Sequence, residues 1–119
     1  MMSDQSPVEP HRGEIWLVDH DPTRGHEQAG QRPALVLSVD VFNLGPADLV
    51  IVIPLTSRLR GIPSHIRIDP PEGGLTRPSA VLCEAVRSVS KSRLVRPWGR
   101  VSATSLERVE DCVRILTGL

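Results

Sequence analysis

The sequence predicts a mainly β domain that ends in a single helix. The apolar runs along the chain are short, and proline and glycine, 11 and 9 of the 119 residues, punctuate them often. Only the C-terminal segment repeats its apolar residues at helical spacing. About five or six short strands and one terminal helix favour a small, strongly bent sheet or barrel with the helix packed on one side.

Three strands are predicted in the first half of the chain. Residues Glu14–Asp19 form a compact apolar run bounded by acidic side chains. Residues 34–39 are nearly all apolar and rich in β-branched side chains, which is typical of a central strand. Residues 49–55 are apolar over almost their whole length, and this pattern predicts a strand buried on both faces.

The second half of the chain contains shorter candidate strands. Residues 64–69 alternate between polar and apolar side chains, so we expect Ile66 and Ile68 to face inward. By the same alternation, His65 and Arg67 are expected to face outward. Further strands are expected at residues 79–83 and 98–101, with a single helical turn between them at residues 91–93.

The C-terminal segment carries the pattern of an amphipathic helix. Apolar side chains recur at three- and four-residue steps, at Leu106, Val109, Val113 and Leu116. Either Ser102 or Thr104 can cap the start, and Thr104-Ser105-Leu106-Glu107 fits a capping box. Gly118 is expected to end the helix.

Length and composition limit the class of protein. A chain of 119 residues fits one domain, which should bury roughly two-thirds of the surface that its unfolded chain exposes. Residues 1–10 are polar and lack the apolar core of a signal peptide, so we expect a loose tail before a single domain over residues 11–119. No apolar run approaches membrane-spanning length, and a cytoplasmic protein that does not bind a membrane is expected.

The formal net charge is zero, but the charges are unevenly spread along the chain. Residues 1–57 hold three basic and eight acidic groups, whereas residues 58–100 hold nine basic and three acidic groups. If the arginines of this middle segment share a face, the neutral total conceals an anion-binding surface. The alternative is a scattered, solvated set of charges, and the sequence favours neither.

Cysteine, histidine and aromatic residues exclude several kinds of site. Cys83 and Cys112 lie among apolar neighbours without metal-ligand spacing, so both are expected to be reduced core residues. The four histidines show no ligand pair either, and we predict neither a metal nor a cofactor. With two tryptophans, one phenylalanine and no tyrosine, a platform that stacks several bases is a poor fit.

The segment over residues 21–33 is the richest in candidate functional side chains. It is a polar connection between two apolar strands, and loops of that length are usually functional or disordered. Arg32 lies near its end, and Pro33 biases the Arg32 backbone toward extended geometry. A guanidinium stays charged and can hold a phosphate through two parallel hydrogen bonds. The alternative is a structural ion pair between Arg32 and Glu27.

Three further side chains are candidates for chemistry. Thr56 follows the strand over residues 49–55, and its hydroxyl can either donate to a phosphate oxygen or cap a turn. Glu27 can act as a general base or orient Arg32. His26 titrates near neutral pH and is the most reactive-looking group of the segment.

These segments carry a specific run of residues. Arg12-Gly13-Glu14-Ile15-Trp16-Leu17-Val18-Asp19 is followed by Asp21-Pro22, Gly25, Glu27-Gln28, Gly30 and Arg32-Pro33-Ala34. Further along come Ile53-Pro54-Leu55-Thr56-Ser57 and Ile62-Pro63-Ser64-His65-Ile66. The pattern closely resembles MazF/PemK-type toxins, and the resemblance covers nearly the whole chain beyond residue 11.

The resemblance implies a type II toxin–antitoxin endoribonuclease with a compact SH3-like barrel of the MazF, Kid and CcdB type. Such enzymes cut single-stranded RNA at short sequences without a metal, and they leave a 2′,3′-cyclic phosphate and a 5′-hydroxyl. They form homodimers, a MazE-like antitoxin blocks their RNA groove, and DNA is contacted only through the antitoxin complex.

The same resemblance assigns roles to particular residues. It implies catalytic roles for Arg32 and Thr56, with Glu27 as a secondary candidate for a base or an orienting group. RNA contacts are expected at Gly25, His26, Gln28, Ser57, His20, Arg58 and Arg87.

Two positions depart from the family pattern. Glu84-Ala85 stands where many members carry Asp/Glu-Gln, and His20 stands where relatives are often apolar. Both are expected to influence which sequence is cut. A rival hypothesis is a CcdB-like toxin of the same fold that binds a protein target such as gyrase, and an SH3-like interaction module is a third. Such proteins need not keep Glu27, Arg32 and Thr56, so their presence favours the nuclease.

Overall fold

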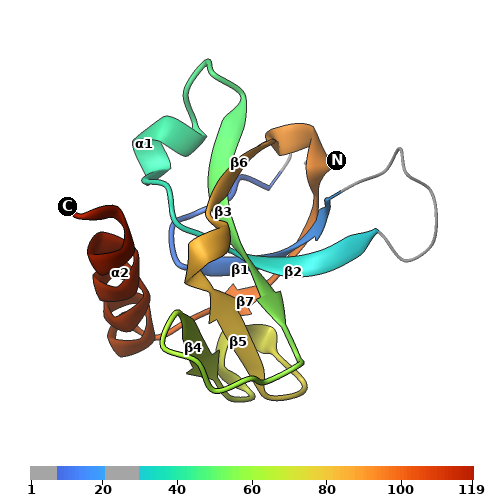
Figure 1. Cartoon of the computed structure of the whole chain (residues 1–119). Helices are drawn as coiled ribbons and strands as arrows, with labels where there is room; N and C mark the ends of the chain where they lie inside the picture. The colour runs from blue at the N-terminus through green and yellow to red at the C-terminus, as the bar shows by residue number, and fades with distance from the viewer. Residues whose placement is uncertain (1–7, 21–29) are drawn as a thin grey trace.

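A curled antiparallel sheet and one long C-terminal helix build the molecule (Figure 1). The structure, a computed structural model, describes residues 8–20 and 30–119. The strands are β1 (Glu14–Asp19), β2 (Gln31–Val36), β3 (Leu49–Thr56), β4 (His65–Ile68), β5 (Ser79–Leu82), β6 (Arg87–Ser90) and β7 (Leu94–Arg100). The helices are α1 (Asp40–Asn43) and α2 (Ala103–Thr117), and single 3-10 turns are η1 (Glu72–Gly74), η2 (Cys83–Ala85) and η3 (Lys91–Arg93). The mainly β class with a C-terminal helix is confirmed.

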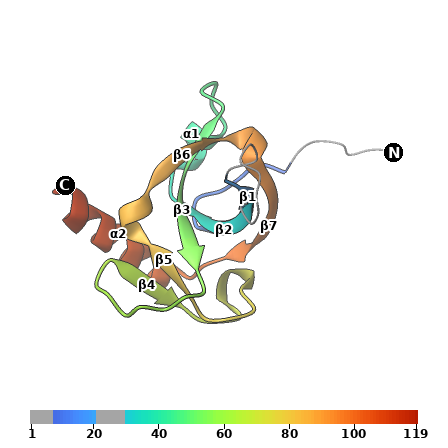
Figure 2. The same ribbon diagram turned by 45° about the vertical axis from the view of Figure 1, so that its right-hand side comes forward.

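The order of the strands shows how the sheet curls. It runs β4-β5-β3-β2-β1-β7, and β6 also pairs with β3. Figure 2 looks along the curl, with β6 and β7 sweeping round it and η3 between them. None of the pairings between described residues joins β7 to β6 or to β4. Closure into a complete barrel therefore stays a prediction.

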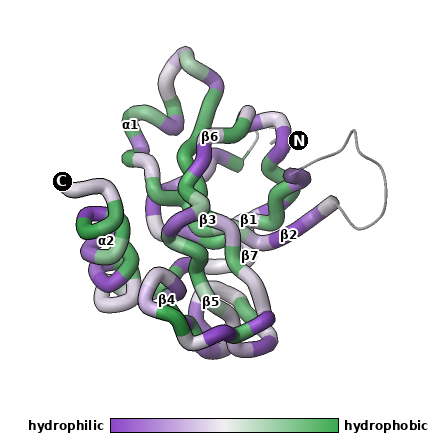
Figure 3. Tube along the Cα trace, viewed as in Figure 1, coloured by the Kyte–Doolittle hydropathy of each residue, from purple (hydrophilic) through white to green (hydrophobic). Residues whose placement is uncertain are grey.

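The strands β1, β2 and β3 are apolar on both faces because each face covers a separate cluster. Ile15, Leu35 and Ile53 belong to the larger cluster, against which α2 also packs. Trp16 and Val52 belong to the smaller cluster on the opposite face, together with apolar side chains of β6 and β7. Successive residues of a strand point to opposite faces, so the buried stretches of these strands are almost continuously apolar, whereas β2 begins with the exposed Gln31 and Arg32 and its outer part is purple in Figure 3.

The first half of the sheet agrees with the prediction except at β2. The bounds of β1 are as predicted, and β3 continues one residue further, to Thr56. The prediction of a strand over residues 34–39 was wrong at both ends, since β2 begins at Gln31 and ends at Val36. Pairing with β1, where Arg32 lies opposite Val18, extends the strand into the segment predicted as a loop.

In the second half, β4 was predicted in place but one of its side chains was not. Ile68 is buried and Ile66 packs against the larger cluster, as expected. His65 was expected to face outward, yet its side chain is only 8% exposed, and its Nε2 lies 3.1 Å from the Glu84 Oε2 of η2. Strand β6 was not predicted, because its four residues include one apolar side chain and its pairing with β3 defines it. The short helix α1 was also missed.

The helix α2 begins one residue after its cap and ends at a glycine. The Ser102 hydroxyl accepts a hydrogen bond from the Ser105 amide at 3.1 Å, so Ser102 is the N-cap. The predicted capping box at Thr104 is wrong, because the helix has already started at Ala103. Gly118 adopts a φ of 78° and donates its amide to the Arg114 carbonyl, which confirms the predicted end.

Two contacts fasten the N-terminal part of the described chain to the sheet and to α2. Glu9 pairs with Lys91 at 2.8 Å, and Arg12 pairs with Glu110 of α2. Arg12 also donates to the Leu37 carbonyl, so one guanidinium bridges the sheet and the helix.

Within residues 8–20 and 30–119, neither helix is both long and apolar enough to cross a membrane.

A glycine contact joins η1 to β7. A Cβ added to Gly99 would lie 2.7 Å from the Gly74 nitrogen and 2.8 Å from the Gly73 carbonyl carbon. A Cβ on Gly74 would run into the Trp98 carbonyl oxygen, and Gly74 also has a φ of 75°. Both obstacles are backbone atoms that cannot rotate away, so η1 approaches β7 only because both positions lack a side chain.

Candidate active site

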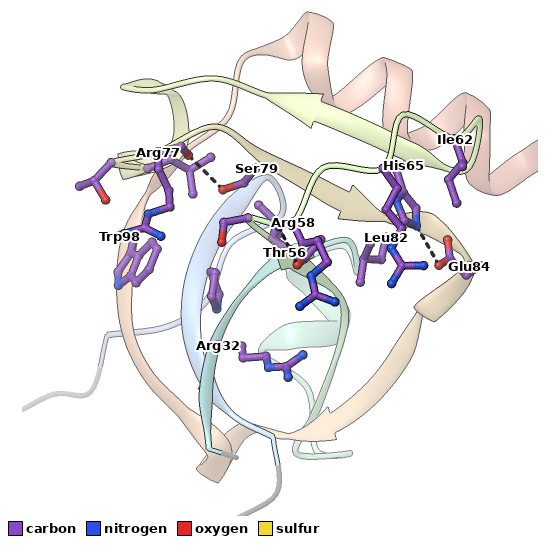
Figure 4. A pocket seen from close by; sticks show the side chains of 16 residues that line it. Arg32, Thr56, Arg58, Ile62, His65, Arg77, Ser79, Leu82, Glu84 and Trp98 are labelled. Atoms are coloured by element: carbon purple, nitrogen blue, oxygen red, sulfur yellow. Dashed lines mark hydrogen bonds and ion pairs between the residues drawn. The ribbon is translucent and has the colours of Figure 1, made fainter. Parts of the chain in front are cut away.

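An open cleft of about 860 Å³ lies beside the end of β3 (Figure 4). Strands β2, β3, β4, β5 and β7, the turn η2 and the loops that follow β3 and η1 supply its walls. Its lining is Arg32, Pro33, Leu55, Thr56, Ser57, Arg58, Arg60, Ile62, His65, Leu75, Thr76, Arg77, Ser79, Leu82, Glu84 and Trp98. The cleft therefore contains four of the residues predicted to act on RNA, namely Arg32, Thr56, Ser57 and Arg58.

The strand register brings Arg32 and Thr56 together. Ala34 lies opposite Pro54 in the ladder between β2 and β3, and Val36 lies opposite Val52. The ladder ends at Ala34 and Pro54, and two residues beyond it Arg32 and Thr56 fall on the same face of their strands as the smaller apolar cluster. Both side chains thus stand where that face ends and the cleft begins (Figure 4).

Thr56 both caps a turn and keeps a proton to donate. Its hydroxyl oxygen accepts a hydrogen bond from the Arg58 amide at 3.1 Å, which is the turn-capping role considered from the sequence. A hydroxyl accepts through its lone pairs and donates through its single hydrogen. The cap therefore fixes the position of the oxygen and leaves the O–H free to donate into the cleft.

The lining of the cleft is strongly basic. Arg32, Arg58, Arg60 and Arg77 line it, and Glu84 is the only acidic residue of the lining within residues 8–20 and 30–119. Arg58, Arg60 and Arg77 of the basic middle segment thus share one surface, as the anion-binding alternative requires, and binding of an anion there stays a prediction. Arg60 and Arg77 were not singled out in the sequence, because their loops give no register that would predict where they point.

His20, Arg87 and Arg93 form a second basic group next to Arg32. Arg93 donates to the His20 carbonyl at 2.9 Å and to the Asp19 carbonyl at 3.3 Å. Burial lowers the pKa of His20, and the nearby charges of Arg87, Arg32 and Arg93 lower it further. His20 is therefore an uncharged imidazole at neutral pH. Neither His20 nor Arg87 belongs to the cleft lining, so the structure does not join these two predicted RNA contacts to it.

At the end of the cleft away from Trp98 and Arg77, His65 and Glu84 form a pair (Figure 4). The His65 Nε2 lies 3.1 Å from the Glu84 Oε2, and the Glu84 side chain is 49% exposed. Burial tends to raise the pKa of Glu84, but hydrogen bonds from its own amide, from Ser64 and from His65 outweigh it and lower the pKa. The alternating pattern of β4 did not predict this pair, because its partner comes from η2.

The two cysteines are free thiols, and Cys83 is buried as predicted, while Cys112 is partly buried. Burial, with a contribution from Cys112 beside it, raises the pKa of the Cys83 thiol to about 12. A thiol with so high a pKa is not a nucleophile.

In residues 8–20 and 30–119, no three His, Cys, Asp or Glu side chains cluster as metal ligands. Four predicted site residues, Gly25, His26, Glu27 and Gln28, lie outside the described residues.

The comparison with protein families agrees with this arrangement. Residues 11–117 match the family described as PemK-like, MazF-like toxin of type II toxin-antitoxin system. The chain belongs to this family. The match spans nearly all of the described residues, including the strands that hold Arg32 and Thr56.

Individual relatives in the family cover almost the full length of the chain. Endoribonuclease MazF9 of Mycobacterium tuberculosis is 38% identical over 109 residues, 87% of this chain and 92% of its own. Endoribonuclease EndoA of Bacillus subtilis is 30% identical over 109 residues, 91% of this chain and 94% of its own. A MazE-MazF crystal structure from Deinococcus radiodurans has a TM-score of 0.82 at 31% identity, over 95% of this chain and 99% of that one.

Proposed function

We propose that this chain is the toxin of a type II toxin–antitoxin system and acts as a metal-independent endoribonuclease. The substrate is single-stranded RNA, and the products carry a 2′,3′-cyclic phosphate and a 5′-hydroxyl. The juxtaposition of Arg32 and Thr56 at a cleft lined by four arginines carries this proposal. Membership of the family supports it, as do the endoribonuclease relatives.

In this reaction the RNA supplies its own nucleophile. The 2′-oxygen forms a bond to phosphorus, the bond from phosphorus to the 5′-oxygen breaks, and the proton lost from the 2′-hydroxyl is balanced by one gained on the 5′-oxygen. Arg32 donates to the equatorial oxygens, where negative charge grows in the transition state. The Thr56 hydroxyl donates to another phosphate oxygen. Arginine is unsuitable as the base, because a guanidinium stays protonated at any working pH.

The proton acceptor is assigned to the segment before β2. We propose Glu27 as the base or as the group that orients Arg32, and His26 as a neighbouring RNA contact. His20 has the protonation state of an acceptor at neutral pH, since its pKa is lowered. Its place beside Arg32 makes it a candidate for tuning the preference for the sequence that is cut.

The assembly proposed for this chain follows its structural relatives. Several of the Deinococcus radiodurans structures are of MazE-MazF complexes, and a mycobacterial endoribonuclease is also known in complex with its cognate antitoxin. We propose that this chain forms a homodimer in the cytoplasm, with an SH3-like barrel in each subunit. A MazE-like antitoxin covers the cleft, and DNA is contacted only through that complex.

One assay tests the activity directly. Purified protein is incubated with a long single-stranded RNA of mixed sequence in EDTA, and both ends of every fragment are mapped. We expect cuts at a short recurring sequence, with a cyclic phosphate on one side and a 5′-hydroxyl on the other. Thr56→Val serves as the inactive control, because it keeps the shape of the side chain and removes the donor. Absence of cleavage at any sequence would refute the nuclease and favour a toxin that binds a protein target.

A further inference from the structure

Glu84 is unusual among the side chains of the cleft because it carries negative charge. Among the described residues of the lining, which include four arginines, it is the only acidic one, and its side chain is about half exposed, at 49%. An ionised carboxylate repels the phosphates that the arginines attract, and it can only accept hydrogen bonds. Whatever part of an RNA strand reaches Glu84 must therefore offer N–H or O–H groups.

His65 holds this carboxylate in position. Its side chain is only 8% exposed, and its Nε2 lies 3.1 Å from the Glu84 Oε2. Within the described residues the His65 Nδ1 is buried without a hydrogen-bond partner. A proton on Nε2 lets the ring donate to Glu84, whereas a proton on Nδ1 would leave a buried donor unsatisfied. The ring therefore acts as a fixed donor that orients the carboxylate.

The position of His65 and Glu84 in the cleft suits contact with a nucleobase next to the bond that is cut. Figure 4 shows Thr56 and Arg58 in the middle of the cleft, with His65 and Glu84 toward one end and Trp98 and Arg77 toward the other. A phosphate held between Arg32 and Thr56 would leave a neighbouring nucleotide within the part lined by Glu84. Single-stranded RNA is read in this way, through hydrogen bonds to the edges of unstacked bases.

We propose that Glu84, positioned by His65, selects a nucleobase that carries an exocyclic amino group. Of these nucleobases, guanine is preferred. Guanine presents its N1–H and its amino group side by side, which matches the two oxygens of a carboxylate. Uracil has one N–H flanked by two carbonyl oxygens, and a carboxylate repels those oxygens. This inference rests on the proposed nuclease function, and it makes Glu84 a specificity residue and His65 a positioning residue.

Inosine in place of guanine provides the test, because inosine lacks only the exocyclic amino group. Cleavage mapping first identifies the positions next to the cut, and each is then replaced by inosine in a short RNA. We expect inosine at one position to lower kcat/KM of the wild-type protein by about tenfold or more. In Glu84→Gln, guanine and inosine should be cut at nearly equal rates, because the second acceptor oxygen is gone.

Two further variants separate selection from folding. Glu107→Gln removes a carboxylate from the exposed face of α2 and should keep the wild-type preference. His65→Ala should reduce discrimination between guanine and inosine, and His65→Gln, which still has an N–H to donate, should restore part of it. Thermal melting of each variant checks that it is folded.

The outcomes distinguish this inference from the proposed function. If wild-type protein and Glu84→Gln discriminate equally between the two bases at every position, the inference is overturned while the nuclease stands. A wild-type protein that cuts RNA without any preference for amino-bearing bases near the cut would overturn it as well. If the wild-type protein cuts no RNA, it is the nuclease proposal itself that fails.

Discussion

At the scale of single residues, the setting of Arg32 matters most. Its backbone lies in β2, where it pairs with Val18 of β1, and it is thus held by a ladder of hydrogen bonds. This ladder fixes the backbone from which the exposed Arg32 side chain reaches into the cleft, where its guanidinium can stabilise charge on a phosphate. Thr56 is fixed in a similar way by the hydrogen bond from the Arg58 amide.

Replacing Arg32 with lysine tests whether the planar fork is needed. A lysine keeps the charge but cannot hold two phosphate oxygens in one plane. We expect kcat to fall by about 100-fold or more, with a smaller change in KM. Steady-state cleavage of a short RNA measures both constants. Arg114→Lys, on the exposed end of α2, is the matched control, and near-wild-type turnover in Arg32→Lys would contradict the role given to the fork.

His20 should make the stability of the protein depend on pH. Its pKa is lowered in the folded chain from an ordinary value of 6.5, so the unfolded chain binds the proton more readily. Stability is therefore lost as the pH falls below about 6.5 and until the lower folded pKa is passed. We expect His20→Leu to lose less stability than the wild type between pH 7.5 and 5, as measured by urea unfolding. A difference between the two proteins that does not change with pH would rule this out.

Residue-scale predictions from the sequence rested on the resemblance for Arg32 and Thr56, and the structure places both in the lining of one cleft. Their catalytic roles stay predictions. His65 was misplaced, because alternation along β4 does not show its pairing with Glu84 of η2. The roles of Glu27 and His26 remain predictions.

At the scale of elements, strands with long apolar runs were found and elements defined by pairing were not. β1 and β3 bury both faces, so their composition alone reveals them. β6 has one apolar residue and exists because it pairs with β3, and β2 starts early because β1 lies beside it. Such contacts between distant segments leave no periodic signal in the sequence.

The cap of α2 gives a prediction at this scale. The Ser102 hydroxyl satisfies the Ser105 amide, so Ser102→Ala should lower the free energy of unfolding by about 1 kcal/mol. Ser102→Gly should cost only a few tenths of a kcal/mol, roughly, because glycine is tolerated at this position. Chemical denaturation measures each change. Thr104→Ala is the control, and a larger loss there than in Ser102→Ala would place the cap at Thr104 after all.

At the scale of the whole molecule, a chain without net charge carries a basic cleft. The balance of 14 basic and 14 acidic groups holds for the total, while the described part of the cleft lining has four arginines and one glutamate. Charge counted along the sequence indicated this imbalance, but only the fold shows which arginines share a surface. Attraction of RNA should therefore depend on the cleft and not on the overall charge.

Salt dependence measures how many of these arginines meet phosphates. Binding to single-stranded nucleic acid changes with the logarithm of salt concentration by about −0.7 for each phosphate neutralised. With four arginines in the cleft we expect a slope near −3, roughly. Fluorescence anisotropy can follow binding of an RNA whose 2′-hydroxyl at the cut is removed. Arg77→Gln should reduce the slope and Arg108→Gln should not, and equal slopes in both variants would contradict a binding role for the cleft arginines.

The close approach of Gly74 and Gly99 bears on how this toxin can be lost by mutation. Neither glycine is expected to touch RNA, yet any side chain at either position collides with backbone. In cells forced to express the chain without an antitoxin, survivors arise from substitutions that abolish its action. We expect positions 74 and 99 to appear among the survivors about as often as Arg32 and Thr56, and deep sequencing of the survivors would count them. A pair of residues with no chemical function would then limit the divergence of the family as strictly as its active site does.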